Sequence, residues 1–309
     1  MVAAVFPGQG SQKPGMGREL FESEPHAAEV FARAGDALGF DVAALCFETD
    51  EDTLRQTENA QVALFTCGVA AFAALDREAA FGIAAGHSVG EYAALAAAGF
   101  LTVEDGARLV RRRGLLMAAS GQARPGAMAA VLGLEREALE GVCQAASDVG
   151  VVVIANDNCP GQLVISGSVE GVARAGELAS EAGAKRVLSL NVSGAFHSPL
   201  MTEAAAEMGA ALREVEFRPG RMPVVANATA EPVTDPSAWP GLLELQMEAP
   251  VRWTESVLTM RTLGVNTFVE CGAGDVLSGL LKRIDREADG LRVGDIESLA
   301  STRAVLDSR

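Results

Sequence analysis

The sequence is poor in basic residues. Its 309 residues include 25 Lys and Arg against 41 Asp and Glu, which gives a formal net charge of −16 at pH 7. Proteins that bind nucleic acid neutralise its phosphates with clustered Lys and Arg. We therefore expect no nucleic-acid partner.

Histidine and cysteine are also scarce, which limits the possible chemistry. The three histidines, His26, His87 and His197, are too few for a histidine-rich site, so we expect no metal. The five cysteines are odd in number and form no C-x-x-C pair. This usage is typical of free thiols in a reducing compartment, and we expect a cytoplasmic protein.

Long apolar runs and targeting signals are missing as well. The N-terminal stretch 1–7 has no basic group and too short an apolar run for a signal peptide. The longest weakly polar stretches are interrupted by Gly and by charge, so we expect no membrane-spanning helix. With 49% hydrophobic and 21% charged residues, the composition is that of a globular protein with one large domain or two unequal ones.

A G-x-S-x-G pattern is present at Gly86, Ser88 and Gly90. An apolar run at 81–85 precedes it and a helix-forming run at 91–98 follows it. Strand, tight turn and helix in that order form the context of a nucleophile elbow, in which the helix N-terminus faces the oxyanion. Because so short a pattern also occurs by chance, the flanking strand and helix are what favour a catalytic Ser88.

A helix predicted from a capping box at 102–105 through residue 119 carries three consecutive arginines, 111–113. Residues three and four positions apart are neighbours on a helix. For Arg113 alone, all of these neighbours are apolar: Leu109, Val110, Leu116 and Met117. The residues leave two interpretations open, an arginine that snorkels or pairs internally, and a buried cation that awaits a substrate anion.

The dipeptide Pro125-Gly126 marks a boundary in the chain. After it the pattern predicts a strand, a helix, two strands, a helix and a strand, at 127–132, 135–146, 151–155, 162–166, 169–182 and 186–190. This βαββαβ order fits a ferredoxin-like insert, with 156–161 as a hairpin-like loop. Further strands are predicted at 2–6, 223–227 and 267–270, whereas residues past about 285 show little pattern and are predicted to form a loose end.

Ser88 needs a base, since a free hydroxyl is a poor nucleophile near neutral pH. His87 is adjacent to Ser88, but neighbouring side chains diverge at such a turn. His26 lies in a polar helical stretch that is typical of a surface. His197, in a Gly-flanked loop before Pro199, is the candidate by elimination, and the alternative is a solvated loop histidine.

Six segments carry a resemblance to a known family: 6–12, 86–92, Arg113-Gly114, 154–158, 194–198, and Gln246 with 250–253. Together, and in this order, they resemble the malonyl-CoA:acyl-carrier-protein transacylases of fatty acid synthesis, over residues 2 to 284. The resemblance implies an α/β fold with an α/β-hydrolase-like larger subdomain, 1–125 and 192–309. The smaller ferredoxin-like (βαββαβ) subdomain would be 126–191, and the active site would lie in the cleft between the two.

The resemblance also implies roles for individual residues. Ser88 would be the nucleophile and His197 the base and acid, with the histidine oriented by the backbone carbonyl of Gln246 rather than by a carboxylate. The backbone N–H groups of Gln9 and Val89 would form the oxyanion hole.

Acyl specificity would come from Arg113 and Phe196. Arg113 would hold the malonyl carboxylate with two hydrogen bonds, and the ring of Phe196 leaves little room for an α-methyl group. The chain departs from the family pattern at Glu248-Ala249 and at Asp275, which bears on surface charge and carrier docking.

The implied activity is that of an S-malonyltransferase. It would move the malonyl group from malonyl-CoA to the phosphopantetheine thiol of acyl carrier protein by a ping-pong mechanism through a malonyl-serine ester. No cofactor is expected, and we expect a monomer without membrane contact.

Three other interpretations remain. A serine hydrolase or thioesterase would use the same elbow with water as acceptor. An acyltransferase of this kind could serve a polyketide synthase instead of fatty acid synthesis. A docking module that binds carrier protein without chemistry would leave Ser88, His197 and Arg113 without a purpose.

Overall fold

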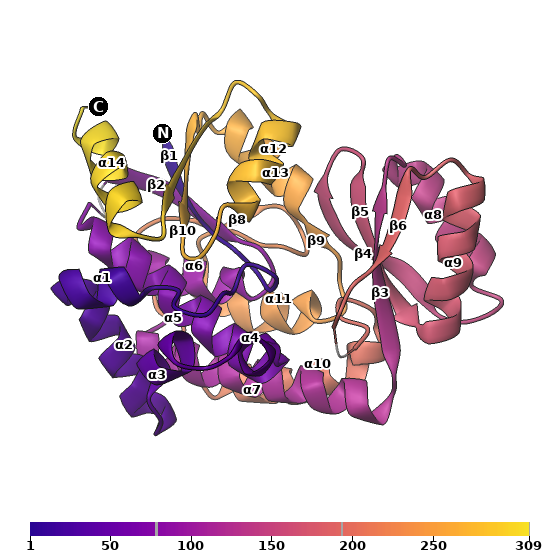
Figure 1. Ribbon diagram of the computed structural model, residues 1–309, viewed down its shortest axis with the longest axis horizontal. Helices are drawn as coiled ribbons and strands as arrows, with labels where there is room; N and C mark the ends of the chain where they lie inside the picture. The colour runs from indigo at the N-terminus through magenta and orange to yellow at the C-terminus, as the bar shows by residue number, and fades with distance from the viewer. Residues whose placement is uncertain (78–79, 193, 309) are drawn as a thin grey trace.

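A sheet of six strands runs through the larger part of the protein (Figure 1). The computed structural model describes residues 1–77, 80–192 and 194–308. The strands lie in the order β11 (Asp289–Val293), β10 (Thr267–Cys271), β1 (Val2–Phe6), β2 (Phe81–Gly86), β7 (Val224–Val225) and β8 (Pro232–Val233). All neighbouring pairs are parallel except β7 with β8. The structure is therefore of the α/β class, as predicted.

The central strand β1 is buried on both faces, so its side chains alternate between two apolar layers. Ala3 and Val5 pack with helices α12 (Trp253–Thr262) and α13 (Val276–Ile284). The other residues of β1 belong to a second cluster with helices on the opposite face, chiefly α5 (Thr57–Leu75). Successive side chains of a strand point to opposite faces, so this arrangement requires the continuous apolar run of the sequence.

The helix α5 has no polar face. By length and composition it could cross a membrane, which differs from our expectation that no such helix exists. However, 83% of its apolar window is buried inside the protein. A helix that is hydrophobic all round also suits the core of a large domain, and α5 occupies that position here.

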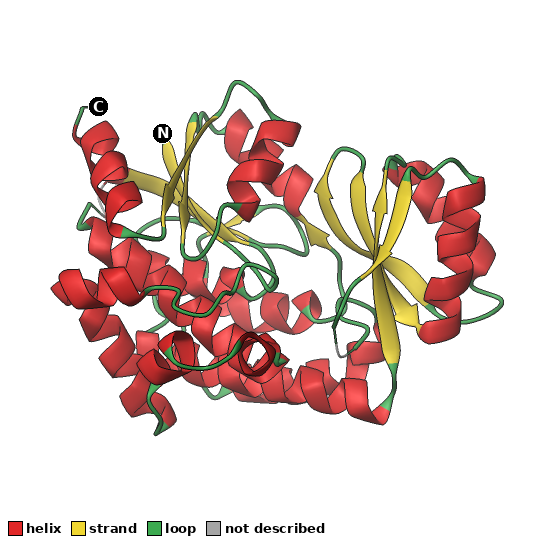
Figure 2. Cartoon of the chain, in the orientation of Figure 1, coloured by secondary structure: helices red, strands yellow, loops and turns green. Residues whose placement is uncertain are grey.

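The other helices of the larger part lie around this sheet (Figure 2). They are α1 (Arg18–Ser23), α2 (Pro25–Leu38), α3 (Val42–Phe47), α4 (Glu51–Arg55), α6 (Gly90–Ala98), α7 (Val103–Ala123), α10 (Thr202–Arg213) and α11 (Trp239–Gln246), with short turns η2 (Pro199–Met201) and η3 (Pro236–Ala238). The helix α7 runs one turn past the predicted end at 119 and leads directly into the second sheet (Figure 1).

The second sheet has five strands, in the order β6 (Arg186–Ser189), β3 (Gly126–Leu132), β5 (Gln162–Ser168), β4 (Val152–Cys159) and β9 (Val251–Arg252). Two helices, α8 (Arg136–Ala146) and α9 (Val169–Glu181), share an apolar core with it. In Figure 1 both helices lie on the side of this sheet that faces away from the larger sheet. The predicted order of strands and helices in this segment is therefore confirmed.

The predicted loop at 156–161 is mostly a strand. β4 continues through Cys159, and only the turn at Pro160 and Gly161 separates it from β5. Asn156 and Asp157 pair with Val251 and Arg252 of β9. The polar run also pairs with β5 as far as Cys159, so strands on both sides satisfy its backbone and local composition gave the wrong prediction.

The predicted loose C-terminal end is also wrong. The strand β11 pairs in parallel with β10, and helix α14 (Ile296–Asp307) follows it. A capping box at Asp295 begins this helix, and Arg303 forms an ion pair with Glu24 at 2.9 Å. Because β11 lies at the sheet edge and exposes most of its side chains, it lacks the apolar alternation that reveals a strand.

Candidate active site

The turn between β2 and α6 has the geometry of a nucleophile elbow. Ser88 adopts a φ of 53°, in the left-handed region that non-glycine residues rarely occupy. A Cβ atom at Gly86 would collide with the backbone of Gly90, and one at Gly90 would collide with the backbone oxygen of Phe6. Both glycines of the pattern are thus required for β1, β2 and α6 to approach this closely.

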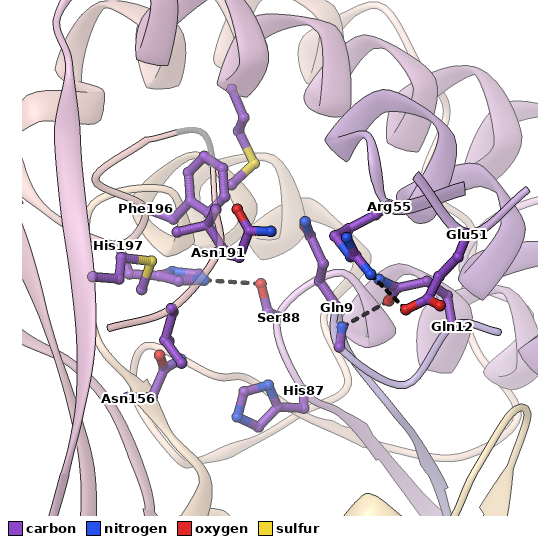
Figure 3. Close-up of a pocket in the computed structure, with 15 residues that line it drawn as sticks. Gln9, Gln12, Glu51, Arg55, His87, Ser88, Asn156, Asn191, Phe196 and His197 are labelled. Atoms are coloured by element: carbon purple, nitrogen blue, oxygen red, sulfur yellow. Dashed lines mark hydrogen bonds and ion pairs between the residues drawn. The ribbon is translucent and has the colours of Figure 1, made fainter. Parts of the chain in front are cut away.

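Ser88 and His197 are within hydrogen-bond distance, as predicted. Ser88 Oγ lies 2.8 Å from His197 Nε2, and Figure 3 shows the two side chains pointing toward each other. On the other side of the ring, His197 Nδ1 lies 2.8 Å from the backbone oxygen of Gln246. Since a carbonyl can only accept, Nδ1 carries the proton and Nε2 is free to accept from Ser88.

His197 is held neutral by its surroundings. Burial lowers the pKa of His197 to about 3, and the nearby positive charge of Arg113 acts in the same direction. A neutral imidazole beside a serine hydroxyl can remove its proton.

The other two histidines do not reach Ser88. His87 Nε2 lies 2.8 Å from Asn158 Oδ1, and its ring packs near Trp253. His26 is exposed on α2. The elimination that pointed to His197 therefore agrees with the geometry.

Arg113 is buried and directed at Ser88, with a relative exposure of 1%. Its Nη2 donates to Ser88 Oγ at 3.2 Å and to Gln246 Oε1 at 2.9 Å. Its Nη1 donates to Gln61 Oε1 at 2.8 Å. The structure excludes an arginine that snorkels to solvent, whereas the internal hydrogen bonds to Gln61 and Gln246 fit both an internally paired arginine and a buried cation that awaits a substrate anion.

Arg113 keeps unused hydrogen-bonding capacity. Among the residues that the structure describes, its Nε–H has no hydrogen-bond partner. A buried donor without a partner is costly, so the site favours a ligand that accepts hydrogen bonds.

The predicted oxyanion donors lie beside the elbow. Val89 directly precedes α6, and Gln9 lies in the loop after β1, where Gly8 packs closely against the backbone of His87. Within the described part of the chain, neither backbone N–H makes a backbone or side-chain hydrogen bond. Both remain available to a ligand.

A cavity of about 310 Å³ opens above Ser88 (Figure 3). Gln9, Met117, Phe196 and His197 line it from the larger part of the protein, and Met128 and Asn156 line it from the second sheet. The predicted acyl-pocket residue Phe196 is thus in place. A second cavity of about 580 Å³ shares Gln9, Arg55, Asn191 and Val192 with the first, so an extended substrate can reach Ser88 from it.

Three residues of the site were missed by the sequence analysis: Gln61, Glu91 and Asn227. Glu91 lies inside a predicted helix, Asn227 at the end of a predicted strand and Gln61 in what the structure shows as α5, so each looked like an ordinary member of its element. Asn227 Oδ1 accepts from the backbone N–H of Ser88 at 2.7 Å. For Gln61 and Glu91 the signal was their position among apolar residues, because an uncompensated polar group in a core requires partners.

Comparison with known proteins decides the family. The sequence model of a protein family, the acyl transferase domain, matches residues 4–296. A malonyl CoA-acyl carrier protein transacylase of Bacillus subtilis is 43% identical over 303 residues, which cover 96% of this chain and 95% of the relative. This chain belongs to that family. A transacylase of the same description from Staphylococcus aureus (strain COL) is 39% identical, with 96% of each chain covered.

Solved structures of the transacylase family have the same fold. An acyl carrier protein S-malonyltransferase from Vibrio cholerae matches with a TM-score of 0.93 and 42% identity, covering 97% of this chain and 99% of the other. The enzyme of that name from Bartonella henselae gives 0.95 and 41%, with 99% of each chain covered. A malonyl-transacylase in complex with a type II polyketide acyl-carrier protein, PlMCAT with AntF, gives 0.94 and 38%, covering 100% of this chain and 99% of the other.

Proposed function

We propose that this protein transfers the malonyl group of malonyl-CoA to the phosphopantetheine thiol of an acyl carrier protein, through a malonyl ester of Ser88. Family membership gives the reaction class. The observation that carries the rest is the position of Arg113 Nη2, 3.2 Å from Ser88 Oγ, beside a serine that also faces a neutral histidine. A hydrolase of simple acyl esters has no use for a buried cation at that place.

The first half of the reaction acylates Ser88. His197 Nε2 takes the hydroxyl proton as Oγ attacks the thioester carbonyl, and the N–H groups of Gln9 and Val89 bind the resulting oxyanion. As the tetrahedral intermediate collapses, the carbon–sulfur bond breaks and His197 returns the proton to the CoA sulfur. The malonyl group is then an ester on Ser88.

The second half reverses these roles. His197 takes the proton of the phosphopantetheine thiol, and the sulfur attacks the ester carbonyl. The ester bond to Ser88 breaks, and its Oγ recovers the proton from His197. No electrons are exchanged with a cofactor, and we propose that the enzyme needs none.

Arg113 selects the acyl group in this scheme. Its hydrogen bond to Ser88 Oγ is given up when that oxygen becomes an ester oxygen, and the freed N–H turns to the malonyl carboxylate. A guanidinium holds a carboxylate with two parallel hydrogen bonds. Phe196 closes the pocket near the α-carbon, which favours malonyl over α-methylated groups.

We also propose the two-part description of the fold. Residues 1–125 and 192–309 would form an α/β-hydrolase-like body, and 126–191 a ferredoxin-like subdomain. The order β6-β3-β5-β4 with two helices on one face supports the second label, and the elbow between β2 and α6 supports the first.

The cellular setting is inferred from composition. We propose a cytoplasmic monomer without membrane contact, whose partners are malonyl-CoA and acyl carrier protein. All five cysteines are free and buried, which suits a reducing compartment. In the described ranges no group of three or more His, Cys, Asp and Glu could hold a metal ion, and we propose a metal-independent reaction.

A second candidate is malonyl transfer to a polyketide carrier protein. The relative solved with a type II polyketide carrier protein favours it, since that chain is as similar in structure as the others. The chemistry at Ser88 would be identical in both cases. Relative kcat/KM values for fatty acid and polyketide carrier proteins would decide between them.

Intact-mass spectrometry tests the proposal. Malonyl-CoA alone should add one malonyl group to the protein, and a thiol acceptor should remove it without release of free malonate. Ser88→Ala should abolish the addition. Labelling that persists in Ser88→Ala would place the nucleophile elsewhere, and rapid loss of the label to water alone would favour the hydrolase.

A further inference from the structure

Glu91 is a buried carboxylate in the centre of the site that the proposed mechanism does not use. It lies in the first turn of α6, with a relative exposure of 1%. Its Oε1 accepts from the backbone N–H of Asn227 at 3.0 Å, and its Oε2 accepts from Nε2 of Gln246. A carboxylate at a helix N-terminus is ordinarily explained by the helix dipole, but such a role needs neither burial nor these two partners.

Both partners of Glu91 hold the backbone of Ser88. Asn227 accepts from the Ser88 N–H at 2.7 Å, and Gln246 Nε2 donates to the Ser88 carbonyl oxygen at 2.9 Å. The backbone of Ser88 is in a left-handed conformation, which costs free energy unless surrounding groups fix it. Glu91 thus holds the side chain of Gln246 and the backbone of Asn227, the two residues that hold the elbow from both sides.

Gln246 also connects Glu91 to the guanidinium of Arg113. Since Arg113 can only donate, the oxygen of the Gln246 amide must face Arg113. The NH₂ group must then face Glu91 and the Ser88 carbonyl. Within the described part of the chain, both hydrogen-bond partners of Glu91 are therefore donors, and each of its carboxyl oxygens accepts from one of them.

The charge state of Glu91 does not carry this arrangement. Glu91 lies near the buried positive charge of Arg113, and the two act on each other's ionisation. The hydrogen bonds from Asn227 and Gln246 and the charge of Arg113 favour the ionised form, but burial outweighs them and raises the pKa of Glu91 to about 8. The carboxyl group is therefore mostly protonated at pH 7, and the inference rests on the positions of its two oxygen atoms.

We infer that Glu91 is a positioning residue for acyl selection: through Gln246 it aims the Arg113 guanidinium at the malonyl carboxylate. This inference rests on the proposed function. It assigns Glu91 no contact with substrate. Its effect must therefore appear in discrimination between malonyl and acetyl groups, and not only in overall activity or stability.

Glu91→Gln tests the inference with almost no change in size. The variant places a second NH₂ group among donors, so the Gln246 amide loses its fixed orientation. The ratio of malonyl-CoA to acetyl-CoA kcat/KM should fall by about 10-fold or more, because a hydrogen bond to a charged group is typically worth that factor. An unchanged ratio, with both substrates slowed equally, would overturn the inference and leave Glu91 a structural residue.

Glu270→Gln is the matched control. Among the described residues, Glu270 is the other carboxyl side chain with 0–1% exposure; it accepts from the N–H groups of Leu277 and Ser278 at the start of α13, away from the cavity. This substitution replaces a buried carboxyl group and its hydrogen bonds in the same way. It should lower the thermal midpoint while leaving the malonyl-to-acetyl ratio at the wild-type value.

Two further measurements keep the test decisive. If Glu91→Gln does not fold, Glu91→Asp can replace it in the test. Aspartate keeps a carboxyl group but is one methylene shorter, so it no longer reaches Gln246. The malonyl-to-acetyl kcat/KM ratio should fall in the same way. Because Glu91 reaches Arg113 through Gln246, the double variant Glu91→Gln with Gln246→Ala should lower the malonyl-to-acetyl kcat/KM ratio no further than the more severe single variant does. If the losses in the two single variants add up in the double variant, Glu91 does not act through Gln246. Failure of the proposed function would look different, since the wild type itself would then transfer no malonyl group.

Discussion

Arg113 contacts both Ser88 Oγ and Gln246, whose backbone oxygen lies 2.8 Å from His197 Nδ1. Arg113→Ala should lower malonyl kcat/KM by roughly 30- to several-thousand-fold, because removing one member of a buried charge pair costs about 2–5 kcal/mol. The acetyl group of acetyl-CoA has no carboxylate that Arg113 could bind, so the turnover of acetyl-CoA should be retained or improved. The measurement is the malonyl-to-acetyl ratio of kcat/KM.

Arg113→Lys is the control for charge alone. An ammonium cannot form two parallel hydrogen bonds to one carboxylate, so only part of the ratio should return. If Arg113→Ala left the ratio unchanged, the arginine would be a structural partner of Gln61 and Gln246 only.

His197 should function as a base far below the pH at which a free histidine is protonated. Its pKa is lowered to about 3, so it stays neutral and able to accept a proton at pH 5. The single-turnover rate of malonylation should therefore remain nearly constant from pH 8 to pH 5. A fall to half-maximal rate near pH 6.5 would contradict the burial of His197 in the working enzyme.

The same histidine should destabilise the fold in acid. Between pH 6.5 and 3 the unfolded chain binds a proton at this position that the folded chain does not, so the free energy of unfolding falls as the pH falls. The contribution of His197 is about 1.4 kcal/mol for each pH unit in that window. His197→Gln should reduce the slope of stability against pH there.

The sequence singled out the residues that lie together around Ser88 Oγ and missed those that hold them in place. Ser88 and His197 stand in loops with an unusual local pattern, and Arg113 stands on an apolar stripe. Glu91, Gln61 and Asn227 acquire their roles only when segments more than fifty residues apart meet. The local sequence pattern does not show which distant segments come into contact.

Helices α5 and α7 cross at Gly114, which directly follows Arg113. A Cβ atom at Gly114 would lie 2.6 Å from the Cα of Glu58, a backbone atom that cannot move aside alone. Gly114→Ala should therefore lower the free energy of unfolding by about 1–3 kcal/mol. Since Gln61 lies in the displaced part of α5, the malonyl-to-acetyl ratio should fall too, as measured alongside urea denaturation.

Gly141→Ala in α8 is the matched control for that substitution. A Cβ atom at Gly141 would meet nothing within 4 Å. Replacing a glycine in a helix interior should then raise stability by roughly 0.5–1 kcal/mol and leave the ratio unchanged. Equal effects of the two substitutions would show that the crossing of α5 and α7 is not tight.

Elements were predicted well where their apolar faces are buried and poorly where they are not. Strands β1 and β2 and the segment from β3 to α9 have clear apolar patterns, and the predictions agree to within a few residues; β6 was also predicted although it is mostly exposed. The edge strand β11 is mostly exposed, and the polar end of β4 is a strand because it pairs with both β5 and β9. Pairing with a distant segment is a property of the whole chain.

Docking of an acidic carrier protein must overcome the net charge of −16. Two exposed basic clusters are close to one β-turn: Lys185 with Arg186, and Lys282 with Arg283 and Arg286. Lys185 packs over Gly133, whose N–H donates to Gly161, and Arg283 donates to the carbonyl of Pro160. The turn at Pro160 and Gly161 therefore brings both clusters to one surface.

Charge reversal in both clusters should raise KM for the carrier protein and leave KM for malonyl-CoA unchanged, with a larger effect at low salt. Lys185→Glu with Lys282→Glu is the preferred pair, because Arg283 also bonds Gln162 and Pro160. Arg218→Glu, an exposed arginine in the loop after α10, is the control. If KM for the carrier stayed constant, docking would lie on another surface.

The central position of β1 determines when the enzyme can first work during its synthesis. This strand is made long before its neighbour β10, which begins only at residue 267. Asn227 and Gln246, which hold the Ser88 backbone, are also made after Ser88, His197 and Arg113. A nascent chain that already contains the serine, histidine and arginine thus has no assembled site, and we expect a competent nucleophile only after β10 has been made.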